Sequence, residues 1–223
     1  MKEKKLIIFD FDGVIYNSEE LHFKSFNFAL EPIGLTITKE VYYEYYCSYD
    51  DEGFFKNFLK DNDITFDSDL ILRLIKEKHF FFDKNYDSEP SIFPGSIELI
   101  KKLSKRYILG IGSGARREEI VRVLKKEDLL SSFEEIVSSD DTSHPKPNPE
   151  TYILLLERVN ETYQIRPDEC VVIEDTTKGV EAAKTAGMRC FAITNSVGSE
   201  LLNNADLTIS DYSEITDKSI NEI

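Results

Sequence analysis

Residues 6–13 read Leu-Ile-Ile-Phe-Asp-Phe-Asp-Gly, a short apolar run that leads directly into two aspartates and a glycine. The apolar residues do not alternate with polar ones, which is typical of a strand buried on both faces of a parallel sheet. Alternation along the extended chain places Asp10 and Asp12 on one side, and Gly13 permits a sharp backbone turn. Because ligands bind beyond the carboxyl ends of parallel strands, we expect this pair at the ligand-binding edge of a sheet.

Five more apolar runs follow, and each ends in small or polar residues: 107–111, 136–137, 171–173, 190–193 and 207–209. Helical signals lie between these runs, at 96–104, 115–125, 148–150 and 177–187. Asn148 is the expected N-cap of its helix, with Pro149 as first helical residue, and Gly187 is the expected C′ glycine of the last helix. This alternation predicts an α/β fold with a doubly wound parallel sheet.

Residues 17–88 interrupt this alternation, because the segment has no clear strand and carries aromatic residues at helical spacing. We expect a small helical domain (17–88) inserted into an α/β domain formed by 1–16 and 89–223. The aromatic residues are expected to form its core, with a substrate-facing lining as the alternative: Phe23, Phe26, Phe28, Tyr42, Tyr45, Tyr46, Phe54, Phe55 and Phe58. Candidate hinges are Tyr16-Asn17 and the interval 86–94.

Composition narrows the classes of partner. The 223 residues carry a net charge of -15, which argues against nucleic acid, since a phosphate backbone requires a basic face. No apolar run reaches the roughly 18 residues of a membrane helix, and Asp10 makes the first run too short for a signal peptide. The three cysteines lie far apart, without the spacing of disulfides or metal ligands. We therefore expect a cytoplasmic monomer without a membrane partner.

A serine, a lysine and an acidic pair, all candidates for the same site as Asp10 and Asp12, occur later in the sequence. Ser113 lies between two glycines after the second run, where a helix N-terminus could bind a phosphate oxygen. Lys146 lies between two prolines that restrict the backbone, and Glu174-Asp175 ends the run at 171–173. Alone, these are an ordinary turn serine, a surface lysine and an acidic helix start. Their occurrence in this order after Asp10 and Asp12 makes coincidence improbable.

These motifs resemble those of the haloacid dehalogenase superfamily, in the branch with a helical cap inserted after the first strand. The resemblance covers nearly the whole chain and rests on these residues: Asp10-Phe-Asp12-Gly-Val-Ile, Ser113, Lys146 within Pro-Lys-Pro-Asn-Pro-Glu, and Val-Ile-Glu174-Asp175 followed by Gly179 and Ala182-Ala183. It implies a Rossmann-like core with a cap and an enzyme that acts on a small phosphorylated metabolite. An aspartate at the position of Asp12 points to phosphoester chemistry, because the dehalogenases of the superfamily lack it.

The resemblance also implies roles for individual residues. Asp10 would be the nucleophile that forms an aspartyl-phosphate, and Asp12 the general acid and base. Ser113 and Lys146 would hold the phosphoryl group, together with Gly114.

The same resemblance implies a Mg²⁺ site formed by Asp10, the backbone carbonyl of Asp12, and Asp175, with Glu174 bound directly or through water. Electrostatics agrees, because each close contact between like charges costs on the order of 4 kcal/mol at an effective dielectric constant near 20. Lys146 alone cannot offset three carboxylates and a phosphoryl group. A divalent cation can, and ligands that are all oxygen favour magnesium over zinc.

The substrate is less well defined by the sequence. His22 opens the expected cap, and the resemblance places it near the site entrance, although an isolated histidine on an aromatic helix is usually structural. A phosphatase acting on a sugar phosphate or similar metabolite is the first interpretation. A mutase similar to β-phosphoglucomutase is the second, and a non-enzymatic sugar-phosphate sensor is the third.

The charge of the expected cap favours the phosphatase. A mutase must hold a second phosphate, for which that relative uses a cap arginine, whereas the matching loop here, 47–52, is acidic. Residues 17–88 carry 8 Lys/Arg against 15 Asp/Glu, a net charge of -7. Lys76 or Lys78 remains an alternative source of a cap cation.

Overall fold

The computed structural model describes residues 5–47, 49–86 and 91–223, in two compact units. The first comprises Met1–Tyr16 with Ile92–Ile223, and the second comprises Asn17–Ser91. Two short strands, β2 (Tyr16–Asn17) and β3 (Ser91–Ile92), pair with each other where the chain passes between the units. The expected boundary after residue 88 and the middle of the expected hinge, 87–90, lie outside the described residues.

The first unit contains a six-stranded sheet in the order β5-β4-β1-β6-β7-β8, with every neighbouring pair parallel. Its strands are β1 (Leu6–Phe9), β4 (Ile108–Gly112), β5 (Glu135–Val137), β6 (Cys170–Glu174), β7 (Arg189–Ile193) and β8 (Leu207–Ile209). The order runs outward from β1 in both directions, which makes β1 the switch point where ligands bind in doubly wound sheets. The predicted fold class is confirmed.

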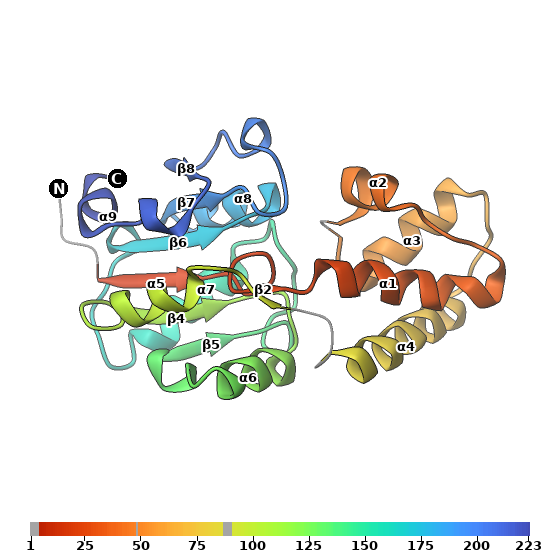
Figure 1. The fold of residues 1–223 in the computed structure, drawn as a ribbon, viewed down its shortest axis with the longest axis horizontal. Coiled ribbons are helices and arrows are strands. Elements are labelled where there is room, and N and C mark those ends of the chain that lie inside the picture. Colours follow the sequence, from red (N-terminus) through yellow and green to blue (C-terminus); the bar gives the residue numbers. More distant parts are fainter. Residues whose placement is uncertain (1–4, 48, 87–90) are drawn as a thin grey trace. The chain divides into compact units, whose positions relative to one another are not determined.

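Helices cover both faces of this sheet (Figure 1). They are α5 (Ser96–Leu103), α6 (Arg117–Lys126), α7 (Glu150–Val159), α8 (Thr177–Thr185) and α9 (Asp217–Glu222), with short 3-10 turns η3 (Leu130–Ser132), η4 (Pro167–Glu169), η5 (Ser199–Leu201) and η6 (Tyr212–Glu214). One apolar cluster joins Leu6 and Ile8 of β1 to α7 and α8. Ile7 and Phe9 of the same strand are also fully buried, so β1 has no solvated face, as its continuous apolar run predicts.

Two helix starts differ from the sequence prediction. The helix expected from residue 115 begins at Arg117, after Arg116 as N-cap. Pro149 is the N-cap of α7 rather than its first helical residue, while the Asn148 side chain accepts a hydrogen bond from the Glu150 amide at 3.0 Å. Gly187 follows α8 with φ +76°, the left-handed conformation expected of a C′ glycine.

The second unit is helical in its described residues, apart from the ends that join β2 and β3. Its elements are α1 (Glu19–Leu30), η1 (Glu31–Ile33), α2 (Lys39–Val41), the π-helical turn η2 (Tyr42–Tyr46), α3 (Asp51–Asp61) and α4 (Ser68–Asn85). An aromatic cluster forms its core, in which the Phe54 ring stacks on Phe26 with ring centroids 3.7 Å apart. Most of the aromatic residues expected in this core are buried, but Tyr45 is 61% exposed.

The helices of the described residues include no segment that is both long and apolar enough to cross a lipid bilayer.

Phe54→Ala is expected to loosen the second unit without affecting the sheet. The Phe54 side chain is fully buried against other rings, and such truncations cost about 3–5 kcal/mol. We predict that hydrogen exchange in peptides from α3 and α4 becomes about 100-fold faster or more, while exchange in β6 is unchanged. Tyr45→Ala is the control, since its ring is mostly exposed. Unchanged exchange in α3, or equal acceleration in β6, would contradict the division into two units.

Candidate active site

The register of the sheet brings the predicted residues of three strands to one edge. Phe9 pairs with Ile111 on one side and with Ile173 on the other, so the next residues in line are Asp10, Gly112 and Glu174. The Asp10 amide donates to the Ile173 carbonyl at 2.9 Å, which extends the pairing by one residue. The site therefore lies at the carboxyl ends of β1, β4 and β6.

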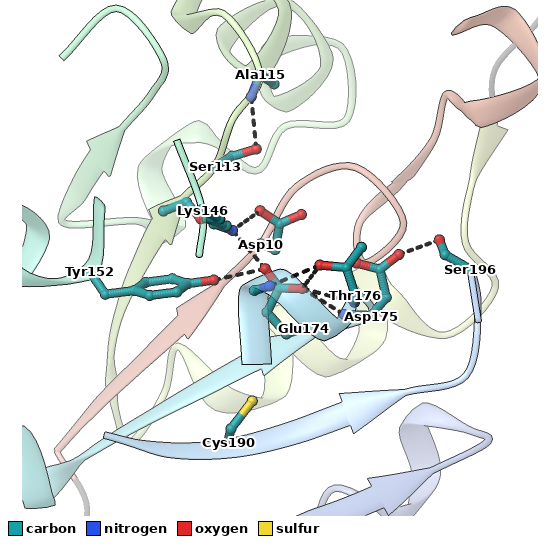
Figure 2. Close-up of polar contacts among 12 residues, drawn as sticks. Asp10, Ser113, Ala115, Lys146, Tyr152, Glu174, Asp175, Thr176, Cys190 and Ser196 are labelled. Atoms are coloured by element: carbon teal, nitrogen blue, oxygen red, sulfur yellow. Dashed lines mark hydrogen bonds and ion pairs between the residues drawn. The ribbon is translucent and has the colours of Figure 1, made fainter. Parts of the chain in front are cut away.

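Lys146 is at the centre of this edge. Its Nζ donates to Asp10 Oδ1 at 2.6 Å, to Glu174 Oε1 at 2.6 Å and to the Gly112 carbonyl at 3.1 Å. Figure 2 shows the lysine between the two carboxylates. An ammonium group has three N–H donors, and all three have acceptors here. One cation thus joins side chains that are more than 100 residues apart in the sequence.

Glu174 is held on both of its carboxylate oxygens. Oε1 accepts from Lys146 and from the Tyr152 hydroxyl at 2.9 Å. Oε2 accepts from the amides of Asp175 and Thr176, at 2.9 and 3.1 Å, and from the Thr176 hydroxyl at 3.0 Å. A carboxylate with this many donors at the end of a buried strand has a fixed orientation.

Two glycines make room for the acidic pair. A Cβ at Gly179, in α8, would lie 1.8 Å from Glu174 Oε1, and a Cβ at Gly13 would lie 1.7 Å from Asp175 Oδ2. Gly13 also has φ +79°, a conformation that L side chains rarely adopt. The same Oδ2 of Asp175 accepts from the Ser196 hydroxyl. The Asp175 carboxylate therefore lies directly against the backbone of the loop that carries Asp10 and Asp12.

The charges of the buried groups are coupled. Burial raises the pKa of the Asp10 carboxyl, Lys146 lowers it and Glu174 raises it, with a net rise to about 7. Burial also raises the pKa of Glu174, but Lys146 and the backbone donors more than offset this, so its pKa is lowered. The pKa of Lys146 is raised by the two carboxylates against the opposite effect of burial. Glu174 and Lys146 are therefore the charged pair, and Asp10 needs further positive charge to be fully ionised at neutral pH.

The other predicted phosphate-binding residues lie on the loop after β4. The Ser113 side chain is buried, its hydroxyl accepts from the Ala115 amide at 3.1 Å, and a hydrogen bond from it lowers the pKa of Asp10. Gly114 is exposed and has open space around its Cα. The expectation that Ser113 lies at a helix N-terminus is wrong, because α6 begins only at Arg117. The intervening residues form a separate loop.

Asp12 and His22 are the remaining predicted site residues. Asp12 is partly buried and forms an isolated β-bridge with Tyr16, within the turn that follows β1. His22 belongs to the second unit, where its ring lies 4.5 Å from the ring of Phe82 in α4. The predicted role of each stays a prediction.

The donor atoms suit a hard cation. No group of three or more His, Cys, Asp or Glu side chains in the described part of the chain is arranged to hold a metal ion. Mg²⁺ does not need one, because it commonly takes one or two carboxylates and completes its shell with water, carbonyl or phosphate oxygens. Asp10 and Asp175 are two such carboxylates, and Asp175 lies against the backbone at Gly13, on the loop that follows Asp10. Glu174 has both oxygens in hydrogen bonds, which favours contact through water over direct coordination.

Several residues around the site were not found from the sequence. Tyr152, Thr176 and Ser196 each bond one of the two acidic side chains. Tyr152 lies on the apolar stripe of α7 and reads as an ordinary core residue, while the two hydroxyl residues resemble loop and helix-cap residues. Thr176 directly follows Asp175 in the sequence, whereas the contacts of Tyr152 and Ser196 to the acidic pair appear only in the folded structure.

Comparison with known proteins agrees with this geometry. The sequence profile of the haloacid dehalogenase-like hydrolases matches residues 7–193. The chain belongs to the haloacid dehalogenase-like hydrolases. The predictions of this superfamily and of an enzyme are thereby confirmed.

Within these hydrolases, the chain is 30% identical over 194 residues to a phosphorylated carbohydrates phosphatase of Thermotoga maritima, covering 86% of each protein. It is 24% identical over 222 residues to a β-phosphoglucomutase of Bacillus subtilis, covering 95% of this chain and 92% of the relative. A crystal structure of a Clostridium difficile β-phosphoglucomutase superposes with a TM-score of 0.85 at 21% identity, covering 98% of this chain and 96% of the other. At that identity the superposition shows a shared fold only.

Gly179→Ala tests the packing of Glu174 in this hydrolase. The new methyl group would lie within 2 Å of the Glu174 carboxylate, which five donors hold in place, so one of the two must move. We predict a loss of about 1–3 kcal/mol of stability in urea unfolding and, in a crystal structure, a lengthened distance between Glu174 and Lys146 Nζ. Glu181→Ala, an exposed change on the same helix, is the control and should cost less than about 0.5 kcal/mol. Unchanged Glu174 geometry in the Gly179 variant would refute this account.

Proposed function

We propose that this hydrolase is a Mg²⁺-dependent phosphatase that cleaves a small phosphate monoester through an aspartyl-phosphate on Asp10. The observation that carries the proposal is the Lys146 ammonium, held between Asp10 and Glu174 at the switch point of the sheet. A nucleophilic carboxylate adjoining a fixed cation is suited to a dianionic phosphoryl group, because the cation stabilises the oxygens as charge develops on them.

The proposed reaction uses the roles that the resemblance implies for Asp10 and Asp12. An oxygen of Asp10 attacks phosphorus, the bond to the alcohol oxygen breaks, and Asp12 gives its proton to the leaving alcohol. Asp12, now a carboxylate, removes a proton from water as the water attacks the acyl phosphate, which releases phosphate and restores both aspartates. Lys146 and the Ser113 hydroxyl hold the phosphoryl oxygens through both steps. Mg²⁺, when bound by Asp10, Asp175 and the Asp12 carbonyl, supplies positive charge against the phosphoryl group.

The relatives support a phosphorylated carbohydrate as substrate. The Thermotoga maritima relative is a phosphatase of phosphorylated carbohydrates, and an Escherichia coli relative, 26% identical over 191 residues, is a fructose-1-phosphate phosphatase. The similarity to the Bacillus subtilis β-phosphoglucomutase supports a mutase as the second candidate function.

The charges within the second unit favour the phosphatase. Lys78, one of the two cations considered for a second phosphate, is buried, and its Nζ lies 2.9 Å from Asp51 Oδ1. His79 Nε2 lies 2.6 Å from the other oxygen of Asp51. Burial raises the pKa of Asp51, but Lys78 and His79 lower it well below its usual range, so the charge of Lys78 is compensated within the unit. A distal phosphate would have to compete with this ion pair.

Asp10→Asn is expected to reduce phosphate release by about a thousandfold or more, because an amide cannot form the acyl phosphate. The measurement is free phosphate released from a panel of phosphorylated sugars and p-nitrophenyl phosphate, with Mg²⁺ and with EDTA, which should abolish turnover. Asp128→Asn makes the same chemical change at an exposed loop residue and should leave the rate unaltered. Hydrolysis by the Asp10 variant at a rate near that of wild type would remove Asp10 from its role.

Water should outcompete a second sugar phosphate for the acyl phosphate, because Asp51 already neutralises Lys78. With β-glucose 1-phosphate and a trace of the 1,6-bisphosphate, we predict that free phosphate forms faster than glucose 6-phosphate. Both products are followed in the same reaction. A large excess of glucose 6-phosphate over released phosphate would establish the mutase instead.

A further inference from the structure

We propose that Tyr152 is a positioning residue for the phosphate-binding lysine, acting through Glu174. This inference rests on the proposed function of Lys146 and Asp10, and it adds a residue that the sequence presents as part of the hydrophobic core. Tyr152 lies in the apolar cluster beneath the sheet, on α7. What distinguishes it from the rest of that cluster is its hydroxyl group, which reaches the active-site edge (Figure 2).

Tyr152 contacts the charged pair in two ways. Its hydroxyl donates to Glu174 Oε1 at 2.9 Å, the same oxygen that accepts from Lys146 Nζ at 2.6 Å. Its ring lies below the ammonium group, with Nζ 4.7 Å from the ring centroid, within the range of a cation–π interaction. The tyrosine therefore has one contact to the anion and one to the cation of the same ion pair.

The position of the tyrosine is fixed by its neighbours. Its side chain is fully buried, and a Cβ at Gly112 would lie 3.1 Å from two of its ring carbons. The ring thus packs tightly against the backbone of β4, whose Gly112 carbonyl also accepts from Lys146. This packing fixes the position of the ring and its hydroxyl, so the tyrosine holds the Glu174 carboxylate in one place.

The tyrosine hydroxyl affects how the Lys146 ammonium is shared between Asp10 and Glu174. With the tyrosine hydroxyl present, Glu174 Oε1 shares its charge between two donors and binds the ammonium less exclusively. Without that hydroxyl, Oε1 has Lys146 as its remaining donor, and the ammonium is drawn toward Glu174 and away from Asp10. A lysine displaced in this direction stabilises the transferring phosphoryl oxygens less well, whereas the ring and the core packing are untouched.

Tyr152→Phe removes the hydroxyl alone and is the test. We expect kcat for the best substrate of the panel to fall about tenfold or more, the size expected for a hydrogen bond to a charged group, with KM changed by less than about twofold. Tyr107→Phe is the matched control. The Tyr107 hydroxyl also donates to a carboxylate, that of Asp217, at 3.1 Å. Tyr107 precedes β4 and so lies at the amino end of that strand, opposite the edge that carries the site. This control should retain wild-type kcat.

A double-mutant cycle separates positioning from a structural role. In a Glu174→Gln background, Tyr152→Phe should have little further effect on kcat, because the tyrosine acts through that carboxylate. Fully additive losses, or a lower melting temperature with unchanged kcat in the single variant, would overturn the inference.

The third readout does not depend on activity. In a crystal structure of the Tyr152→Phe protein, Lys146 Nζ should lie closer to Glu174 and beyond hydrogen-bonding distance of Asp10. If Nζ keeps its place between the two carboxylates, Tyr152 does not position it, whichever ester the enzyme hydrolyses. If Nζ moves but the wild-type protein releases no phosphate from any ester, the positioning inference holds and the proposed function fails.

Discussion

Two carboxylates, Asp10 and Glu174, lie side by side at the end of a fully buried strand pair, and the Lys146 ammonium donates a hydrogen bond to each. Breaking such a buried pair by removing one partner costs several kcal/mol, because an uncompensated charge is left in a region of low dielectric constant. The rest of the active site is arranged around this constraint. Burial and Glu174 raise the pKa of Asp10 even though Lys146 lowers it, so the site is short of positive charge, which a bound cation would supply.

The fold satisfies this constraint through its topology and through the absence of side chains at two positions. Parallel pairing of β1 with β4 and β6 aligns three strand ends, so that residues far apart in the sequence meet without any one loop having to span the distance. Gly13 and Gly179 then admit the Asp175 and Glu174 carboxylates, which any β-carbon would displace. The second unit also contains a buried charge, that of Lys78, and Asp51 of the same unit compensates it. The same physical rule thus applies to buried charges in both units.

The sequence is informative where a local pattern has one physical cause. Continuous apolar runs predicted all six strands of the sheet, and the motifs around Asp10, Lys146 and Glu174 predicted the family. Helix starts were less accurate, because Pro149 can cap a helix as well as begin it and because Ser113 and α6 are separated by a loop. Tyr152 could not be found in advance, since its helical spacing is that of a core residue and its partner is 22 residues away. Such a role depends on how α7 packs against the sheet, which no local pattern encodes.

The central claim is that Asp10 accepts the phosphoryl group, and the most direct measurement is to locate that group on the protein. The enzyme is mixed rapidly with p-nitrophenyl phosphate and Mg²⁺, quenched in acid, and reduced with borohydride, which converts an acyl phosphate of aspartate into homoserine. Peptide mass spectrometry should then find homoserine at position 10 and an unmodified residue at position 12. Conversion at Asp12, Glu174 or Asp175 instead, or turnover with no acyl phosphate at Asp10, would contradict the account.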